Sequence, residues 1–305
     1  MEVVDAHIHF ISHNYLRLLT QQREHYSDLE TFIAEQAQRH HFEPPPQDPV
    51  RLADRWVIEL DRHNVTRATV ISMIPGDEVS VGAALRVYPD RFIGVATVNP
   101  YLPVAEELVE HAATEWGFRG IMLYPSMTRC SVASERLYPI YRVARKHHMV
   151  VYVHMGRLRL AARRWWGLPD VYDWRYANPA DLHQPATDFP TLPFVVLSFG
   201  SGTLPQLLKL GLQCPNVYVD TSSSNNWLLD QSEFRDLQHA FEKTLEVFGP
   251  GRVLFGSDSD FFPRGWRLPV FNEQREILER LRLSDHAREA ILGGNLRSLF
   301  GLDTA

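Results

Sequence analysis

The stretch Met149-Val150-Val151-Tyr152-Val153-His154 is a short β-branched and aromatic run that ends on a polar residue. Similar runs cover residues 3–8, 67–73, 92–98, 117–123, 193–199, 216–220 and 252–256. The segments between them have the spacing of helices, as in residues 51–63, 103–116, 137–148, 179–189, 203–210 and 233–248. Strands that alternate with helices predict a parallel sheet, and at this length they favour a closed (β/α)8 TIM barrel over an open doubly wound sheet.

The composition narrows the class of protein. The 305 residues are 45% hydrophobic and 22% charged, which excludes a disordered or fibrous chain and predicts one domain over residues 1–305. No apolar run approaches the roughly 18 residues of a membrane span and no secretory leader is evident, so we expect a cytoplasmic protein. Cys130 and Cys214 form no CxxC pair. The net charge of −6, without a basic face, argues against nucleic acid as a partner.

Two connections between the predicted elements are unusually long. Residues 11–50 separate the first strand from its helix, and residues 155–178 follow the fifth strand. In a barrel both emerge at the C-terminal face, where the loops that follow the strands build active sites. We therefore expect them to form a lid and to contact substrate. The tail, residues 267–305, has the pattern of two amphipathic helices around Leu278 and Leu292.

Four polar residues are predicted to meet at this face. His7 and His9 alternate with apolar residues, so both imidazoles lie on one face of the first strand. In isolation such a pair is more often two hydrogen-bonded histidines without a metal. His154 ends the fifth strand, however, and Asp258 ends the eighth, which brings a third imidazole and a carboxylate to the same rim. Such a donor set suits a divalent transition metal.

Several stretches resemble the amidohydrolase superfamily, in the amidohydrolase-related branch that includes aminocarboxymuconate semialdehyde decarboxylase. They are DAHIHF (5–10), PDRFIGVATVNP (89–100), VHMG (153–156), FPTLPFVVLSFGSG (189–202), LFGSDSDFF (254–262) and ILGGNLRSLFGL (291–302). The resemblance implies a metal held by His7, His9, His154 and Asp258. It also implies that Asp258 accepts a proton from the attacking water.

Lysine is scarce, which bears on the number of metals. Only three lysines occur, and none ends a predicted strand, so Schiff-base chemistry is excluded. Binuclear members of the superfamily often use a carboxylated lysine after the fourth strand, where this chain has Met122, Leu123 and Tyr124. We expect one metal per chain, with zinc as the first choice and iron or manganese as alternatives. A second ion held by carboxylates or by loop histidines such as His13, His40 or His41 stays open.

The sequence departs from the family at the sixth strand. Relatives usually carry a histidine there, and in LSFGSG (197–202) we assign its place to Phe199. A phenyl ring cannot accept a proton, so Asp258 is the expected base, with Asp220, Asp260 and His183 as alternatives. Decarboxylation needs a positioned acid that an apolar wall does not supply. Phe199 therefore favours hydrolysis.

The loop after His154 is rich in arginine and tryptophan. A solvated charge cluster is one interpretation. The other is that guanidinium groups bind a carboxylate or phosphate of the substrate while indoles cover its apolar part. On the second interpretation the substrate-contacting residues are Arg157, Arg159, Arg163, Trp165 and Phe199.

The leading hypothesis is a metal-dependent hydrolase that acts on an ester, lactone, amide or thioester of an anionic or aromatic molecule through activated water. The alternative is a metal-dependent, non-oxidative decarboxylase of an aromatic or conjugated carboxylic acid. A catalytically inactive barrel that serves as a binding module is a third hypothesis. The expected partner is a small anionic molecule and neither nucleic acid nor membrane; a homodimer stays open.

Overall fold

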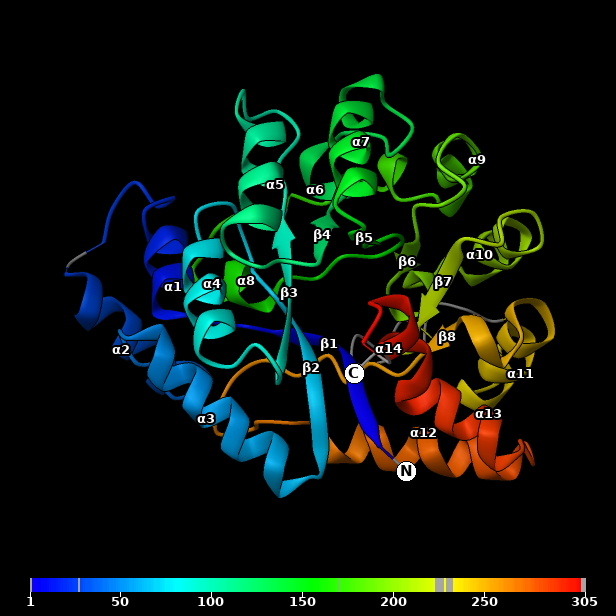
Figure 1. The fold of residues 1–305 in the computed structure, drawn as a ribbon. Helices are drawn as coiled ribbons and strands as arrows, with labels where there is room; N and C mark the ends of the chain where they lie inside the picture. Colours follow the sequence, from blue (N-terminus) through cyan, green and yellow to red (C-terminus); the bar gives the residue numbers. More distant parts are fainter. Residues whose placement is uncertain (1, 27, 170, 223–227, 229–232, 303–305) are drawn as a thin grey trace.

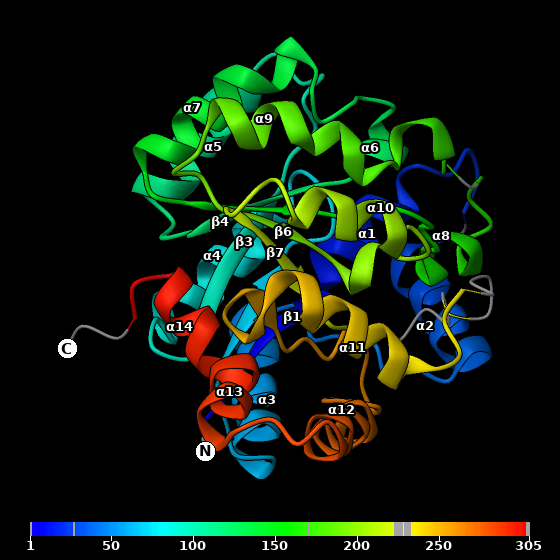
Figure 2. The same ribbon diagram turned by 90° about the vertical axis from the view of Figure 1, so that its right-hand side faces the viewer.

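Eight parallel strands, hydrogen-bonded in chain order, form the centre of the molecule (Figures 1 and 2). The computed structural model describes residues 2–26, 28–169, 171–222, 228 and 233–302. The strands are β1 (Val3–His9), β2 (Val65–Ile71), β3 (Phe92–Thr97), β4 (Gly120–Leu123), β5 (Val150–Val153), β6 (Phe194–Val196), β7 (Val217–Asp220) and β8 (Val253–Leu254). Helices surround them, and the predicted (β/α)8 barrel is confirmed.

Backbone hydrogen bonds between the segment after β8 and β1 close the barrel. The amide of Ala6 donates to the Phe255 carbonyl at 2.8 Å, and the amide of His9 donates to the Ser259 carbonyl at 2.8 Å. A parallel bridge joins Ile8 to Ser259. The last strand segment is therefore fixed against the first, and residues near both ends of the chain meet at one rim.

The outer layer is formed by α3 (Pro49–Arg62), α4 (Glu78–Val87), α5 (Ala105–Thr114), α7 (Tyr138–Lys146), α9 (His183–Asp188), α10 (Leu204–Gly211), α11 (Leu237–Phe248) and α12 (Leu268–Arg280). Most match predicted helical segments, whereas α4 was not singled out. The predicted second tail helix is interrupted: α13 (Asp285–Glu289) and α14 (Asn295–Leu299) are separated by a π-turn. Among the described residues no helix is long and apolar enough to cross a membrane.

The period of two along each strand separates two layers of core. Side chains such as Val4, Val95 and Tyr152 pack together inside the barrel. Their neighbours on the opposite face, such as Val70 and Val151, pack against the surrounding helices. In β1 this alternation is interrupted: Val4 and Ala6 face the interior of the barrel whereas Ile8 faces the helices, and the pairing of β1 with β2 is irregular between Asp5 and Ile8. His7 and His9, on either side of Ile8, therefore face the lumen.

The two long connections meet over one side of the barrel mouth. The first contains α1 (His13–Thr20) and α2 (Leu29–His40), which the sequence patterns did not predict, and the second contains α8 (Ala161–Trp165). All three helices lie together in both ribbon views (Figures 1 and 2). The indole of Trp166 is fully buried between them and donates to the Thr20 hydroxyl at 2.8 Å. A separate apolar cluster thus fastens one connection to the other.

The buried side chain of Asp5 joins the segments that close the barrel. Its Oδ1 accepts the amides of His7 (2.9 Å) and Ser257 (3.0 Å), and its Oδ2 accepts the indole N–H of Trp266 at 2.7 Å. Burial raises the pKa of Asp5 to about 6, although these hydrogen bonds act in the opposite direction. One carboxylate therefore connects β1, the turn after β8 and the segment that leads into α12.

We expect Trp266→Phe to lower the free energy of unfolding by about 1–3 kcal/mol more than a matched tryptophan change, because it leaves Oδ2 of Asp5 buried without a donor. Trp56→Phe is the matched control, since Trp56 is equally buried but its indole N–H has no partner among the described residues. Chemical denaturation measures both. Equal losses in the two variants would contradict this role for the Trp266 hydrogen bond.

Candidate functional site

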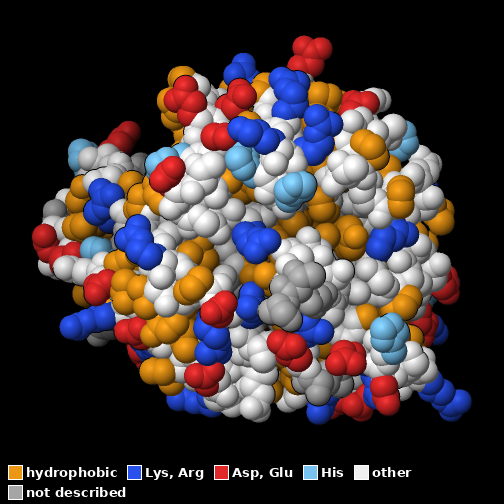
Figure 3. All heavy atoms as spheres, in the orientation of Figure 1, with side chains coloured by type: hydrophobic (Ala, Val, Ile, Leu, Met, Phe, Trp, Pro, Cys, Tyr) orange, Lys and Arg blue, Asp and Glu red, His pale blue; other side chains and the backbone are white. Residues whose placement is uncertain are grey.

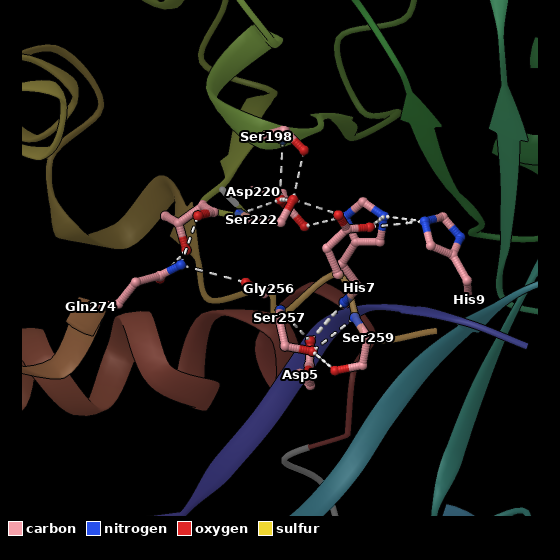
Figure 4. A network of polar contacts seen from close by, with 12 residues as sticks. Asp5, His7, His9, Ser198, Asp220, Ser222, Gly256, Ser257, Ser259 and Gln274 are labelled. Carbon is pink, nitrogen blue, oxygen red and sulfur yellow. Dashed lines mark hydrogen bonds and ion pairs between the residues drawn. The ribbon is translucent and has the colours of Figure 1, made fainter. Parts of the chain in front are cut away.

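His7, His9 and Asp258 converge at the barrel mouth. Nε2 of His7 lies 3.2 Å from Nε2 of His9 (Figure 4). Oδ1 of Asp258 lies 2.9 Å from Nε2 of His9 and 3.5 Å from Nε2 of His7. Asp258 reaches this position because its backbone turns into the left-handed region, with φ of 55°, while its amide donates to the His7 carbonyl at 2.9 Å.

The arrangement of these three side chains fits a cation. Two imidazole nitrogens that face each other at 3.2 Å repel one another unless a proton or a cation lies between them. The ligand atoms of the three residues all lie within 4.8 Å of one another, and they form the one such group found among the described residues. Two imidazoles with a carboxylate are donors that divalent transition metals prefer.

His154 stands at the edge of this group. It follows β5, is 8% exposed, and its ring stacks near Tyr124 with centroids 6.0 Å apart. Burial, followed by the charge of His7, lowers the pKa of His154 to about 4, so its ring is neutral and keeps a free lone pair. His154 lies outside the compact group of three, and its role as a ligand stays a prediction.

The four candidate bases differ in what their side chains contact. Burial alone would raise the pKa of Asp258, but the hydrogen bond with His9 and the charges of His7 and His9 lower it, so the carboxylate is ionised. Asp260 is engaged by Arg264. His183 lines a cavity of about 340 Å³ beside α10, together with Lys209. Asp220 does reach the histidines, because its Oδ2 lies 3.1 Å from Nδ1 of His7.

The expectation that Phe199 faces the pocket is wrong. Its side chain is fully buried in the layer between strands and helices, where the ring packs on Phe241 of α11 at 5.1 Å. Ser198 and Phe199 both adopt φ of 52°, so the alternation of β6 ends before them. Ser198 instead faces the site: its hydroxyl lies 2.7 Å from that of Ser222, and its amide donates to Asp220 at 3.1 Å.

A cavity of about 520 Å³ lies at the mouth, bounded by α1 and by the segments after β2, β3, β4 and β5. Its lining includes Asn99, Tyr124 and Arg163. The Tyr124 hydroxyl is buried and has no hydrogen-bond partner among the described residues. Burial and the nearby Tyr15 and Asp258 raise the pKa of Tyr124, which keeps the hydroxyl protonated. Sequence reasoning named Tyr124 only as a residue that is not lysine.

The arginines of the second connection do not act as one cluster. Arg163 lines the cavity and donates to Gln22 at 2.7 Å, whereas Arg159 and Arg164 are exposed. Arg157 is half-buried, and its amide donates to the Ser201 carbonyl at 2.7 Å. On the face shown in Figure 3, basic side chains are mixed with acidic ones.

The remaining candidates lie in the two long connections over the barrel mouth. Trp165 is half-buried and stacks on His40, with ring centroids 4.8 Å apart. His13 pairs with Glu30 at 2.9 Å. His13, His40 and His41 are not members of the compact donor group, and the number of ions stays a prediction.

Solved structures share this fold. The 5-carboxyvanillate decarboxylase of Sphingomonas paucimobilis gives a TM-score of 0.64 at 13% identity, over 98% of this chain and 99% of that one. The 5-carboxyvanillate decarboxylase of Novosphingobium aromaticivorans, complexed with manganese and 4-hydroxy-3-methoxy-5-nitrobenzoic acid, gives a TM-score of 0.66 at 16% identity. The match covers 98% of this chain and 96% of that one. A probable 2-pyrone-4,6-dicarboxylic acid hydrolase from Acinetobacter baumannii, with citric acid bound, gives a TM-score of 0.60 at 17% identity. The match covers 99% of this chain and 100% of that one.

No curated protein matches the sequence. A family model does: the model described as Amidohydrolase matches residues 4–302, which include the two histidines of β1 and the turn that carries Asp258. This match covers nearly the whole chain, and the protein therefore belongs to the amidohydrolase family.

Proposed function

We propose that this protein is a metal-dependent hydrolase that cleaves an ester, lactone, amide or thioester of a small anionic or aromatic molecule. The observation that carries the proposal is the compact group of His7, His9 and Asp258 at a barrel mouth that also holds a cavity. His7, His9, His154 and Asp258 would hold one divalent ion, with zinc as our first choice. Such an ion acidifies water and polarises a carbonyl group.

Asp258 is the proposed proton acceptor. Its lowered pKa keeps it ionised at neutral pH, and its Oδ1 already lies at the two imidazoles. Phe199 packs between strands and helices and forms no apolar wall at the site, so it gives no support to hydrolysis. Ser198 supports it instead, because a serine hydroxyl at the end of β6 is neither the second base nor the strong acid that a histidine would provide.

Tyr124 is the proposed hydrogen-bond donor to the substrate oxygen. Its hydroxyl stays protonated and has no partner among the described residues, and the charge of Asp258 acts on it. A donor placed before the reaction stabilises the negative charge that develops on an acyl oxygen. Arg163, on the lining of the same cavity, supplies the positive charge that an anionic substrate needs.

Metal content tests the centre itself. We expect purified protein to hold about one divalent ion per chain, and His9→Ala to lose most of it, because removal of a donor weakens ligation. His13→Ala is the control, since His13 pairs with Glu30 outside the group. Elemental analysis after dialysis measures both. Full occupancy in His9→Ala would place the metal elsewhere.

Product analysis and a base variant test the reaction. With a panel of aromatic and anionic esters, lactones and thioesters, Asp258→Asn should lose at least about 100-fold in kcat, as is typical for a general base. Asp260→Asn, which alters a carboxylate held by Arg264, should not share this loss. Carbon dioxide release from aromatic carboxylates, without hydrolysis of any acyl substrate, would favour the decarboxylase alternative and reject the hydrolase.

Arg163 should determine the preference for anionic substrates. We expect Arg163→Ala to raise KM for an anionic ester more than for its neutral analogue, with a smaller change in kcat, because binding rather than chemistry loses a contact. Arg164→Ala, at the adjacent exposed position, is the matched control. Steady-state kinetics on the two esters measure the difference. If the two variants had identical KM values for both esters, Arg163 would have no role in binding the anionic group.

A further inference from the structure

His7 differs from the other two histidines of the site in what its second ring nitrogen contacts. Nδ1 of His7 lies 3.1 Å from Oδ2 of Asp220 and 3.0 Å from the Ser222 hydroxyl. Nδ1 of His9 and Nδ1 of His154 are buried and have no hydrogen-bond partner among the described residues. The orientation of one imidazole is thus fixed by a carboxylate.

Asp220 is held so that only one of its oxygens faces His7. It ends β7 and is fully buried. Its Oδ1 accepts the amides of Ser198 (3.1 Å) and Ser222 (2.7 Å) and also the Ser222 hydroxyl. Figure 4 shows this oxygen surrounded by its donors while the other points at the imidazole. Rotation of the carboxylate would break these contacts, so Oδ2 stays directed at Nδ1.

The close approach of Asp220 to His7 depends on a glycine in the turn after β8. A Cβ atom on Gly256 would lie 2.4 Å from Oδ2 of Asp220 and 3.0 Å from Cβ of His7. Any side chain at position 256 would therefore displace the carboxylate or the histidine. The stretch Gly256-Ser257-Asp258 therefore has two roles. It carries Asp258, and its glycine leaves the space in which Asp220 reaches His7.

We propose that Asp220 is a positioning residue that, in the metal-bound protein, keeps the one remaining ring proton of His7 on Nδ1 and so leaves Nε2 as the metal-binding lone pair. Oδ2 of Asp220 faces Nδ1 of His7 and acts as a hydrogen-bond acceptor, so the ring donates from Nδ1. Nε2 then faces His9 and Asp258, where the ion would be bound. Hydrogen bonds of this kind orient metal-ligating histidines and raise their basicity. The inference rests on the proposed metal site and adds a residue to it.

Asp220→Asn is the decisive substitution because it keeps the volume and reverses one hydrogen bond. The three donors at Oδ1 will retain the amide oxygen there, which turns the amide NH₂ toward Nδ1 of His7. The neutral ring must then accept at Nδ1 and carry its proton on Nε2, where the metal should bind. We expect zinc affinity, measured by competition with a chromophoric chelator, to fall 10–100-fold, as is typical for loss of such a partner.

Asp77→Asn is the matched control. Asp77 is also a fully buried carboxylate near the mouth, but it accepts from Ser12 and Asn14 and touches no histidine. It should leave zinc affinity unchanged. Thermal unfolding of the metal-free variants shows whether each one is folded at the temperature of the titration.

A second measurement needs no variant. In zinc-loaded wild-type protein labelled with ¹⁵N-histidine, nitrogen–proton correlation spectra should place the His7 proton on Nδ1. Zinc on Nδ1 of His7, or unchanged zinc affinity in folded Asp220→Asn, would overturn the inference while the metal site stands. Failure of wild-type protein to bind zinc or manganese would overturn the proposed metal site, and the role of Asp220 with it.

Discussion

The hydrogen bond from the Asp258 amide to the His7 carbonyl is the interaction on which the site depends. It joins the turn after the last strand to the middle of the first, so the contact that helps to close the barrel also sets the carboxylate beside the two imidazoles. The left-handed backbone at Asp258 is needed to bring its side chain back over the lumen. Closure of the fold and the position of the Asp258 carboxylate therefore depend on the same contact.

Two buried carboxylates hold His7 from opposite directions. Asp5 accepts its backbone amide, and Asp220 faces its ring nitrogen. Burial of charged groups is costly, and both carboxylates offset that cost with several donors each. The resulting network leaves His7 little freedom to rotate. In the proposed metal centre, such rigidity would keep His7 in place for the ion.

Much of this arrangement could be predicted from the sequence because it follows from strand periodicity. His7 and His9 share a face through the period of two, and His154 and Asp258 occupy the ends of strands whose C-terminal ends meet. The long connections after β1 and β5 were likewise evident from their lengths. Each of these inferences used only local pattern and the geometry of a closed barrel.

The errors arise where the backbone leaves regular structure. Phe199 aligns with the histidine of relatives, but Ser198 and Phe199 both have positive φ, so this position does not face the lumen. Tyr124 follows an apolar strand, and no sequence pattern marks it as a site residue. Only the structure shows that its hydroxyl is buried without a hydrogen-bond partner among the described residues. The contact between Asp220 and His7 joins residues 213 positions apart, which no local pattern reveals.

Anomalous X-ray diffraction from crystals grown with zinc is the measurement that tests the central claim most directly. We predict one strong peak at the barrel mouth, with Nε2 of His7, Nε2 of His9, His154 and Asp258 as its protein ligands. Zinc bound at the surface pair of His13 and Glu30, or no peak between His7 and His9, would contradict the proposed metal centre.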